Sequence, residues 1–346
     1  MKIQDRVYGM CEINEPLLVD LINSQALKRI QKISQYGGGS EFYYPYPSKS
    51  FSRFEHCVGT ALLLRKLDAS LGTQVSGLLH DAGHFAFSHV SEWALALRNK
   101  DMQAYNNEDL HDKLFLATLK KFEVDKILQK YDIKLEDIEP EKHPLLELPS
   151  PKLCADRVDY ALREIAVDDE IYAQLLSKNL TTYNNEIVFT SKDTAYLFAD
   201  RFLNIQTDHW GSPKVTIFFR LLAEAMVNAL DEGVLNEEDL YKTDEEVTNL
   251  LKTSKHERVQ KNLEMLTSGF ELKENNENPQ YKLRKKFRWV NPKYFENGQV
   301  YSLYETDKLF ATEVEKHRKI NEKGVNVDVF PIDFSIIKKY FKNLKC

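Results

Sequence analysis

The sequence is poor in cysteine and has no long apolar segment. Its four cysteines, at positions 11, 57, 154 and 346, form no Cys-x-x-Cys pair, which argues against a disulfide framework or a zinc ribbon and favours a reducing compartment. No apolar run approaches the ~18 residues that a transmembrane helix needs, and the first residues lack the apolar stretch of a secretory signal. We therefore expect a cytoplasmic protein without a membrane partner.

An excess of positive charge is also missing. The formal net charge over 346 residues is −6, so a chain-wide surface for nucleic acid is absent and no nucleic-acid partner is expected. Hydrophobic residues make up 42% of the chain, which excludes disorder along its whole length. The basic run 282–288 could hold polyphosphate, an allosteric nucleotide or nucleic acid, although a solvated strand face is the commoner explanation of such a run.

The hydrophobic pattern predicts a mainly α-helical first half. Apolar residues recur at helical spacing over 15–35. A Ser-x-x-Glu capping box predicts a helix over 52–72, followed by a short helix over 73–82. Ser150-Pro151 is a good pair of residues for the start of another helix, which would pass through Tyr160.

The second half has a mixed pattern, which predicts a smaller α/β part. The expected elements are a hairpin over 180–189, long helices over 193–209 and 214–231, a solvated loop over 271–280, and a strand pair formed by 285–290 and 299–304. We place a loose domain boundary near residue 180. Residues 1–180 would form one domain, and residues 181–346 a region that shares its core.

Histidine is concentrated in one stretch of the chain. Five of the nine histidines lie between positions 56 and 111: His56, His80, His84, His89 and His111. Leu78-Leu79 places the His80-Asp81 pair in an apolar helix, where an unpaired carboxylate would be costly. A bound divalent cation explains such a pair, because both side chains are metal ligands; a hydrogen-bonded pair in the core is the alternative.

Two further residues complete a candidate metal site. His56 lies in the helix that the capping box opens, and Asp156 lies on a later helix. Together with His80 and Asp81 they would supply imidazole and carboxylate ligands from three helices. Such a set suits Mn, Fe, Co, Ni or Zn better than Ca, and the identity of the metal, Mg included, stays open. Coordination positions would remain for water and a phosphate oxygen.

Several segments carry a family resemblance. They are Arg53-Phe-Glu-His56, His80-Asp81-x-Gly-His84-x-x-Phe-Ser-His89, Asp156-Arg-Val-Asp-Tyr160, the preceding Gln35-Tyr36-Gly-Gly-Gly39, and His111. These segments resemble the HD-domain phosphohydrolases, and within that family the deoxynucleoside triphosphate triphosphohydrolase branch. The resemblance covers roughly residues 25–170.

The resemblance implies roles for individual side chains. The residues that match the family's metal ligands are His56, His80, Asp81 and Asp156. Arg53 matches an arginine that contacts the substrate phosphates, which suits a guanidinium, although an exposed arginine in the first turn of a helix is the commoner case. The residues that match catalytic histidines near the scissile phosphate are His84, His89 and His111. For His84 a supporting role, and for His111 simple exposure in a polar segment, are the alternatives.

The nucleoside end of the resemblance is weaker. Gln35 resembles a residue that reads the sugar 3′-hydroxyl, and Tyr160 one that packs under the deoxyribose; Tyr160 could equally be an ordinary core aromatic. The chain departs from the branch at Arg157, where lysine is common, and at Glu164, where aspartate is common. It also departs at Tyr36, where a smaller aliphatic residue is usual. A bulky Tyr36 could reshape the sugar pocket or fill it.

The resemblance leads us to expect a metal-dependent hydrolase that converts deoxynucleoside triphosphates to deoxynucleoside and triphosphate, as a homo-oligomer. Two alternatives stay open. One is another HD-type activity: a phosphomonoesterase, a phosphodiesterase or a dinucleotide polyphosphate hydrolase. The other is a non-enzymatic nucleotide-sensing protein.

Overall fold

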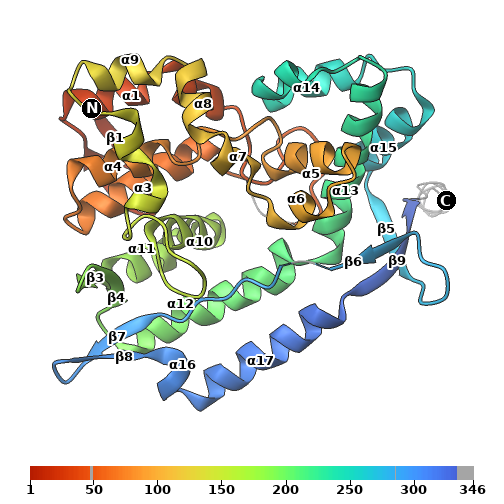
Figure 1. Ribbon diagram of the computed structural model, residues 1–346. Helices are drawn as coiled ribbons and strands as arrows, with labels where there is room; N and C mark the ends of the chain where they lie inside the picture. The colour runs from red at the N-terminus through yellow and green to blue at the C-terminus, as the bar shows by residue number, and fades with distance from the viewer. Residues whose placement is uncertain (47–49, 285, 333–346) are drawn as a thin grey trace, which may run out of the picture.

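Short helices that follow one hairpin build the first half of the chain (Figure 1). The computed structural model describes residues 1–46, 50–284 and 286–332. Strand β1 (Lys2–Asp5) pairs antiparallel with β2 (Gly9–Glu12). The helices are α1 (Pro16–Ile22), α2 (Gln25–Ile30), α3 (Arg53–Lys66), α4 (Leu71–Leu79), α5 (His89–Arg98), α6 (Met102–Asn107), α7 (Leu110–Lys113), α8 (Phe115–Lys121), α9 (Val124–Gln129), α10 (Ala155–Asp168) and α11 (Glu170–Lys178), with 3-10 turns η1 (Leu135–Ile138) and η2 (Pro140–Lys142).

Helices and two small sheets alternate in the second half. Its helical elements are α12 (Lys192–Ile205), the π-helical turn η3 (Gln206–Trp210), α13 (Pro213–Asp231), the 3-10 turn η4 (Glu237–Tyr241), α14 (Asp244–Leu251), α15 (Glu257–Ser268), α16 (Leu303–Thr306) and α17 (Lys308–Lys323). One sheet has the order β3-β4-β7-β8 and the other β5-β9-β6. Their strands are β3 (Leu180–Tyr183), β4 (Glu186–Phe189), β5 (Phe270–Glu274), β6 (Tyr281–Leu283), β7 (Lys293–Glu296), β8 (Gln299–Ser302) and β9 (Val325–Pro331). The mainly α-helical class with a mixed C-terminal part is confirmed.

Local capping moves two of the expected helix boundaries. The helical spacing over 15–35 is confirmed but belongs to two helices, α1 and α2, because the Ser24 hydroxyl accepts a hydrogen bond from the Leu27 N–H and starts α2. The capping box at Ser52 is confirmed, but α3 stops at Lys66, and Ser70 caps α4.

The helix expected from Ser150-Pro151 begins later than predicted. It starts at Ala155, with Cys154 as its N-cap residue. The backbone before it is used differently: the Pro151 carbonyl accepts a hydrogen bond from the Asn291 N–H, a residue far along the chain. A hydrogen bond to a residue this far along the chain cannot be predicted from the local sequence pattern.

Pairing in the C-terminal part differs from the prediction. The hairpin over 180–189 and the helices near 193–209 and 214–231 are confirmed. The expected strand over 285–290 is wrong: β8 pairs with β7 instead, through the tight turn at Asn297-Gly298, where both φ angles are positive. Residue 285 lies outside the described residues. The loop expected over 271–280 is wrong for its first residues, because β5 pairs with the distant strand β9.

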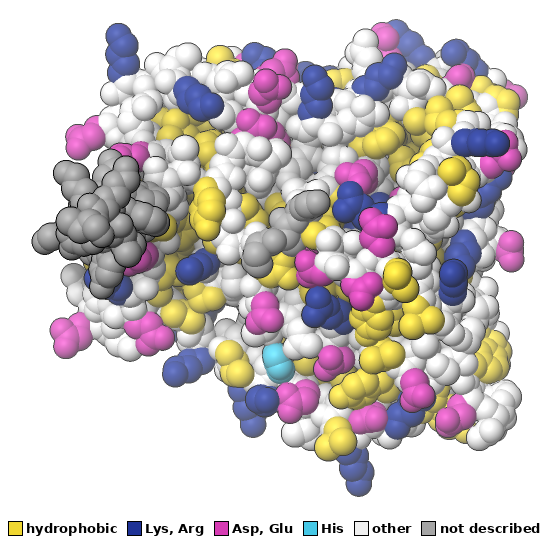
Figure 2. Space-filling view, turned by 180° about the vertical axis from the view of Figure 1, so that it is seen from behind, with side chains coloured by type: hydrophobic (Ala, Val, Ile, Leu, Met, Phe, Trp, Pro, Cys, Tyr) yellow, Lys and Arg dark blue, Asp and Glu magenta, His cyan; other side chains and the backbone are white. Residues whose placement is uncertain are grey.

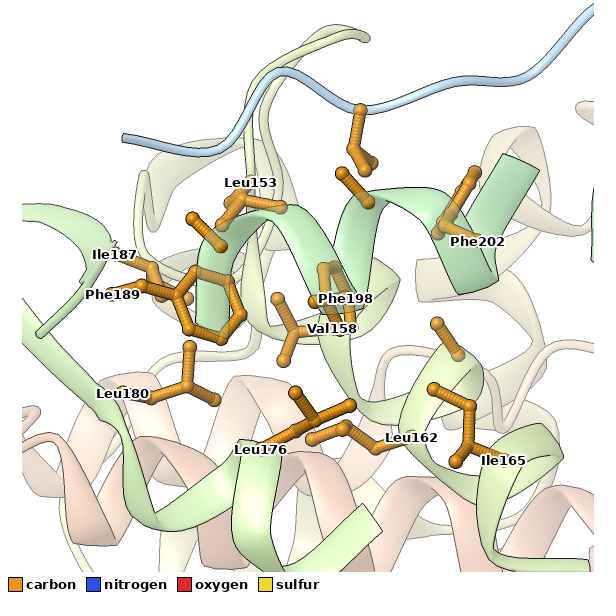
Figure 3. Close-up of a cluster of buried hydrophobic side chains, with 14 of the residues drawn as sticks. Leu153, Val158, Leu162, Ile165, Leu176, Leu180, Ile187, Phe189, Phe198 and Phe202 are labelled. Atoms are coloured by element: carbon orange, nitrogen blue, oxygen red, sulfur yellow. The ribbon is translucent and has the colours of Figure 1, made fainter. Parts of the chain in front are cut away.

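One hydrophobic core cluster joins segments from both halves of the chain. Figure 3 shows side chains of this cluster, from Leu153 and Val158 to Phe198 and Phe202. Helix α10, which carries several of the candidate site residues, contributes Val158, Leu162 and Ile165 to it. The apolar face of α10 is thus fixed against α12 and the β3-β4 hairpin, while its other face is left for the site.

Close helix packing brings α10 against α3. A Cβ atom at Gly59 of α3 would lie 1.6 Å from Arg163 Nη2 and 2.3 Å from Asp159 Oδ1 of α10. Only glycine allows this approach. As a result, the His56 side chain of α3 faces Asp156 and Asp159 of α10 directly.

Charged side chains of both signs are interspersed over the face opposite to that of Figure 1, and neither sign dominates it (Figure 2). Within the described part of the chain, no helix is both long enough and apolar enough to cross a membrane.

Candidate metal centre and active site

The four expected metal ligands lie together. His56 Nε2 is 3.1 Å from His80 Nε2, 2.9 Å from Asp156 Oδ1 and 3.7 Å from Asp81 Oδ2. His80 Nε2 is 3.4 Å from Asp156 Oδ1 and 3.6 Å from Asp81 Oδ1. Three segments position them: α3, the C-terminal end of α4 and the first turn of α10. Each imidazole Nε2 therefore lies within 3.7 Å of an oxygen of both carboxylates.

The outer nitrogens of the two imidazoles are already engaged. His56 Nδ1 lies 2.8 Å from Asp159 Oδ2, and His80 Nδ1 lies 2.8 Å from the Gly77 carbonyl oxygen. If these nitrogens carry the ring protons, both Nε2 lone pairs face each other across 3.1 Å. A cation between them resolves this repulsion, so the donor set fits a divalent transition metal.

The charge of the surrounding carboxylates supports the same conclusion. Burial lowers the pKa of His56, but its bonds to Asp156 and Asp159 outweigh burial and raise it. Burial likewise opposes a charge on Asp81, yet Arg53 and the imidazoles hold the pKa of this carboxyl well below its ordinary value. The centre thus favours positive charge, which a metal ion supplies.

A second histidine cluster lies next to the metal ligands. Glu92 of α5 is its anchor: Glu92 Oε1 lies 2.8 Å from His111 Nδ1 and 3.3 Å from His89 Nδ1. The His84 and His111 rings stack with centroids 3.8 Å apart, and His84 Nε2 lies 3.3 Å from Asp81 Oδ1. Asp81 therefore borders both clusters. The alternative that His111 is simply exposed is wrong, since it is buried.

Protonation differs between the stacked rings. Burial lowers the pKa of His84 well below its ordinary value, and the charges of Arg53 and His111 add to this effect. Burial also opposes protonation of His111, but Glu92 outweighs it and raises the pKa of His111 to about 9. These charges thus favour a neutral ring at His84 and a protonated ring at His111, and a protonated imidazole can serve as a general acid.

Arg53 is buried and is no solvated side chain. Its Nη1 donates to Asp81 Oδ2 at 2.5 Å, and its Nε donates to Ser88 Oγ at 3.0 Å. Ser88 in turn donates to the Ser34 carbonyl oxygen. The guanidinium therefore sits beside a metal ligand, where a phosphate would be within its reach.

One cavity of about 720 Å³ contains the expected substrate-binding residues. Its lining includes Gln35, Tyr36, Arg53, Arg157 and Tyr160, together with His80, Asp81, Asp156, His84, His89 and His111. Arg157 Nη1 donates to the Leu148 and Lys152 carbonyl oxygens. The structure thus places every expected site residue either in this cavity or, for His56, immediately behind its wall.

Two side chains on this lining carry atoms without a hydrogen bond. Among the described residues, Gln35 Oε1 is buried without a hydrogen bond. The ring nitrogens of His84 form none either, and their charged neighbours are Asp81 Oδ1 at 3.3 Å and Glu92 Oε1 at 3.8 Å. Buried polar atoms in folded proteins are normally paired. Because the Gln35 side chain lines the cavity, its oxygen is available as an acceptor for a ligand that donates a hydrogen bond.

The Tyr36 ring takes part in an aromatic group at the end of the cavity. Its hydroxyl donates to Glu164 Oε2 at 2.5 Å, and its ring stacks on Tyr44 and contacts His209 edge to face. Trp210 Nε1 also donates to Glu164, at 2.9 Å. The Glu164 carboxylate is thus already engaged by side chains of the protein.

From the sequence, no role in the site was assigned to three residues: Glu92, Asp159 and Arg288. Glu92, three residues after His89, and Asp159, three residues after Asp156, lie at helical spacing from candidate residues, so this spacing could have revealed them. Arg288 could not be found this way. The expectation of a solvated strand face for the basic run is wrong here, because Lys286 and Arg288 line the cavity and belong to no strand.

Comparison with known proteins agrees with this geometry. The model of the HD domain family matches residues 53–164. The uncharacterized protein YdhJ of Bacillus subtilis is 33% identical over 85% of this chain and 89% of its own length. The metal-dependent phosphohydrolase cns2 of Cordyceps militaris is 29% identical over 76% of each chain. Human deoxynucleoside triphosphate triphosphohydrolase SAMHD1 is 37% identical, but over only 25% of this chain and 16% of its own.

Solved structures share the fold. A hypothetical protein from Aquifex aeolicus superposes with a TM-score of 0.65 at 21% identity, over 92% of this chain and 99% of its own. A phosphohydrolase from Bacteroides thetaiotaomicron gives 0.64 at 16% identity, over 91% and 97%. From the convergent ligand set, the family match and the long alignment with YdhJ, we conclude that this chain belongs to the HD-domain family of divalent-metal-dependent phosphohydrolases.

Proposed function

We propose that the protein hydrolyses deoxynucleoside triphosphates to deoxynucleoside and triphosphate. One observation carries the proposal: the Gln35 side chain, whose buried oxygen forms no hydrogen bond among the described residues, lines the same cavity as the candidate metal ligands. A sugar hydroxyl would satisfy Gln35, and an ester phosphate would lie at the candidate metal ligands. The partial similarity to SAMHD1, whose name gives this activity, supports the same substrate class.

The side chains present can perform the required steps. A divalent cation, when bound, activates water and polarises a phosphate. Attack of water on the α-phosphorus breaks its bond to the sugar 5′-oxygen, which must then gain a proton. His111, held protonated by Glu92, and His89 lie where such a proton can be supplied. Arg53 compensates the growing negative charge on the phosphate.

A second candidate is a hydrolase of a different phosphoester, and the position of Tyr36 favours it. The hydroxyl of Tyr36 engages Glu164, and its ring packs against Tyr44 and His209. If this group occupies the space of a deoxyribose, the substrate must have a smaller or differently shaped alcohol part.

Product analysis separates the two candidates. The metal-loaded protein is incubated with deoxy- and ribonucleoside triphosphates, nucleoside monophosphates, cyclic nucleotides and dinucleotide polyphosphates, and the products are identified by chromatography. Release of intact triphosphate from a deoxynucleotide supports the first proposal. Hydrolysis of another phosphoester, with every deoxynucleoside triphosphate left intact, would replace it with the second.

The Tyr36→Leu variant tests whether the Tyr36 ring lines the sugar pocket or fills it. If Tyr36 only lines the sugar pocket, its loss changes the preference for deoxy over ribo substrates modestly, because apolar packing discriminates by only ~1–3 kcal/mol. If the ring fills the pocket, the variant gains activity on deoxynucleoside triphosphates. Tyr43→Leu is the matched control, since Tyr43 is largely exposed and does not line the cavity.

A further inference from the structure

A C-terminal segment brings positive charge to the cavity from outside the HD match. The connection between β6 and β7 crosses the middle of the molecule past α12 (Figure 1). Residues 286–292, called here the crossing segment, contribute Lys286 and Arg288 to the cavity lining. The HD family match ends at residue 164, so these cations belong to a different part of the chain from the metal ligands.

Contacts with the residues before α10 fix the crossing segment in place. The Asn291 N–H donates to the Pro151 carbonyl oxygen at 2.8 Å, and the Ser150 hydroxyl donates to the Trp289 carbonyl oxygen at 3.2 Å. Between them, Val290 is buried in the shared core cluster. The position of the neighbouring Arg288 is therefore set by the fold.

Two guanidinium groups line the same cavity. Arg288 Nη2 donates to Glu108 Oε2 at 2.8 Å, while Arg157 Nη2 lies 3.6 Å from Glu147 Oε1. Burial opposes the charge of Arg288, but Glu108 outweighs it and raises the pKa; Arg157 is close enough to act in the opposite direction. Like charges held near each other attract an anion that can bridge them.

Arg288 keeps donors for such an anion. In the part of the chain that the structure describes, Glu108 is the only hydrogen-bond acceptor of Arg288, and it takes one of the five N–H groups of a guanidinium. The remaining donors can form the paired bonds that guanidinium groups make with phosphate. Tyr160 lines the same cavity.

We propose that Arg288 and Arg157, together with Lys286 of the same crossing segment, bind the distal phosphates of a nucleoside polyphosphate. The proposal rests on the proposed function for the position of the scissile phosphorus at the metal ligands. It adds that the C-terminal half supplies part of the binding site and selects substrates that carry phosphates beyond the scissile one.

Binding of inorganic tripolyphosphate and of orthophosphate to the manganese-loaded protein tests the inference by calorimetry. Arg288→Ala should weaken tripolyphosphate binding about ten- to hundredfold, the effect of losing a charge-assisted hydrogen bond. Orthophosphate, which needs only the metal ligands and Arg53, should bind with less than about a twofold change. The measurement needs no turnover, so failure of the proposed function leaves its outcome readable.

Two further variants separate charge from structure. Arg284→Ala removes an exposed arginine that does not line the cavity, and should leave both affinities unchanged. Glu108→Gln removes the ion-pair partner of Arg288 but keeps the guanidinium, and should retain or strengthen tripolyphosphate binding. Three results would overturn the inference: unchanged binding in Arg288→Ala, equal loss for orthophosphate, or the same loss in Glu108→Gln.

Discussion

Individual side chains around the metal centre act as a connected set. His56 is held by Asp159 on one ring nitrogen and faces His80 with the other. Asp159 is itself bonded to Arg163, whose Nη2 donates to Asp5 of strand β1 at 2.7 Å. A metal ligand is thus oriented by a chain of buried charges that reaches the N-terminal hairpin, and such support commonly governs metal affinity.

Replacing His80 and Asp81 together by alanine should abolish both metal binding and turnover. The double variant removes one imidazole and one carboxylate from the four ligands, and the remaining His56 and Asp156 cannot enclose a cation. Elemental analysis of the purified variant is the measurement. The control is His143→Ala, a histidine outside the cavity lining, and full metal occupancy in the double variant would contradict the ligand assignment.

His111 should titrate far above an ordinary histidine. Its charged and titratable neighbours are Asp81, His84, His89, Glu92 and Asp112. Because Glu92 raises the pKa of His111 from 6.5 to about 9, its stabilising effect is complete below pH 6.5 and is lost as the pH rises through 9. The loss is on the order of 3 kcal/mol.

Proton NMR titration of the metal-free protein measures this pKa directly. The His111 midpoint should lie near 9 in the wild type and fall to or below 6.5 in Glu92→Gln, which keeps the shape but not the charge. Urea unfolding at pH 6.5 and pH 9.5 should show the matching loss of stability in the wild type alone. A His111 midpoint that is the same in the wild type and in Glu92→Gln would rule out the ion pair between His111 and Glu92.

At the scale of elements, the contact between α3 and α10 decides whether the site forms. Gly59→Ala should destabilise the protein by about 1–3 kcal/mol or more, because the added methyl group overlaps Arg163 and Asp159. It should also weaken metal binding, since His56 lies one turn away on the same helix. Thermal unfolding and metal titration measure the two effects.

Gly72→Ala provides the matched control within α4. A Cβ there meets only Ser70 Oγ, at 3.9 Å, so alanine should be neutral or stabilise the helix by up to ~1 kcal/mol. Equal stability and equal metal affinity in Gly59→Ala and Gly72→Ala would show that α3 and α10 do not pack as closely as described.

At the scale of the whole molecule, a residue of the C-terminal half stabilises the segment between His84 and His89. Asp244, the first residue of α14, accepts hydrogen bonds from the Ser34 N–H at 2.9 Å and the Phe87 N–H at 2.6 Å. Phe87 and Ser88 both have positive φ angles, a backbone conformation that is unfavourable for residues other than glycine. A residue from α14 therefore holds the strained turn that presents Ser88 to Arg53 and begins α5 at His89.

Asp244→Asn should destabilise the protein by about 1–3 kcal/mol, because one backbone N–H loses its acceptor in a buried place. Burial raises the pKa of Asp244 to about 7, so unfolding is best measured at pH 8, where the carboxylate is ionised. Glu245→Gln, the adjacent exposed residue of the same first turn, is the control. An Asp244→Asn variant as stable as this control would argue against a stabilising role for the hydrogen bonds that Asp244 accepts.

The helical class, the capping box before His56 and the candidate metal ligands could all be predicted from the sequence alone. Helix periodicity and caps are local properties, and the ligands lie in short motifs, so their types and spacing are visible in the chain. The tertiary structure decided that Tyr36 bonds Glu164, that Asp244 holds the turn at Phe87 and that Arg288 reaches the cavity. These partners lie more than a hundred residues apart, and only the packing of the core fixes which distant side chains meet.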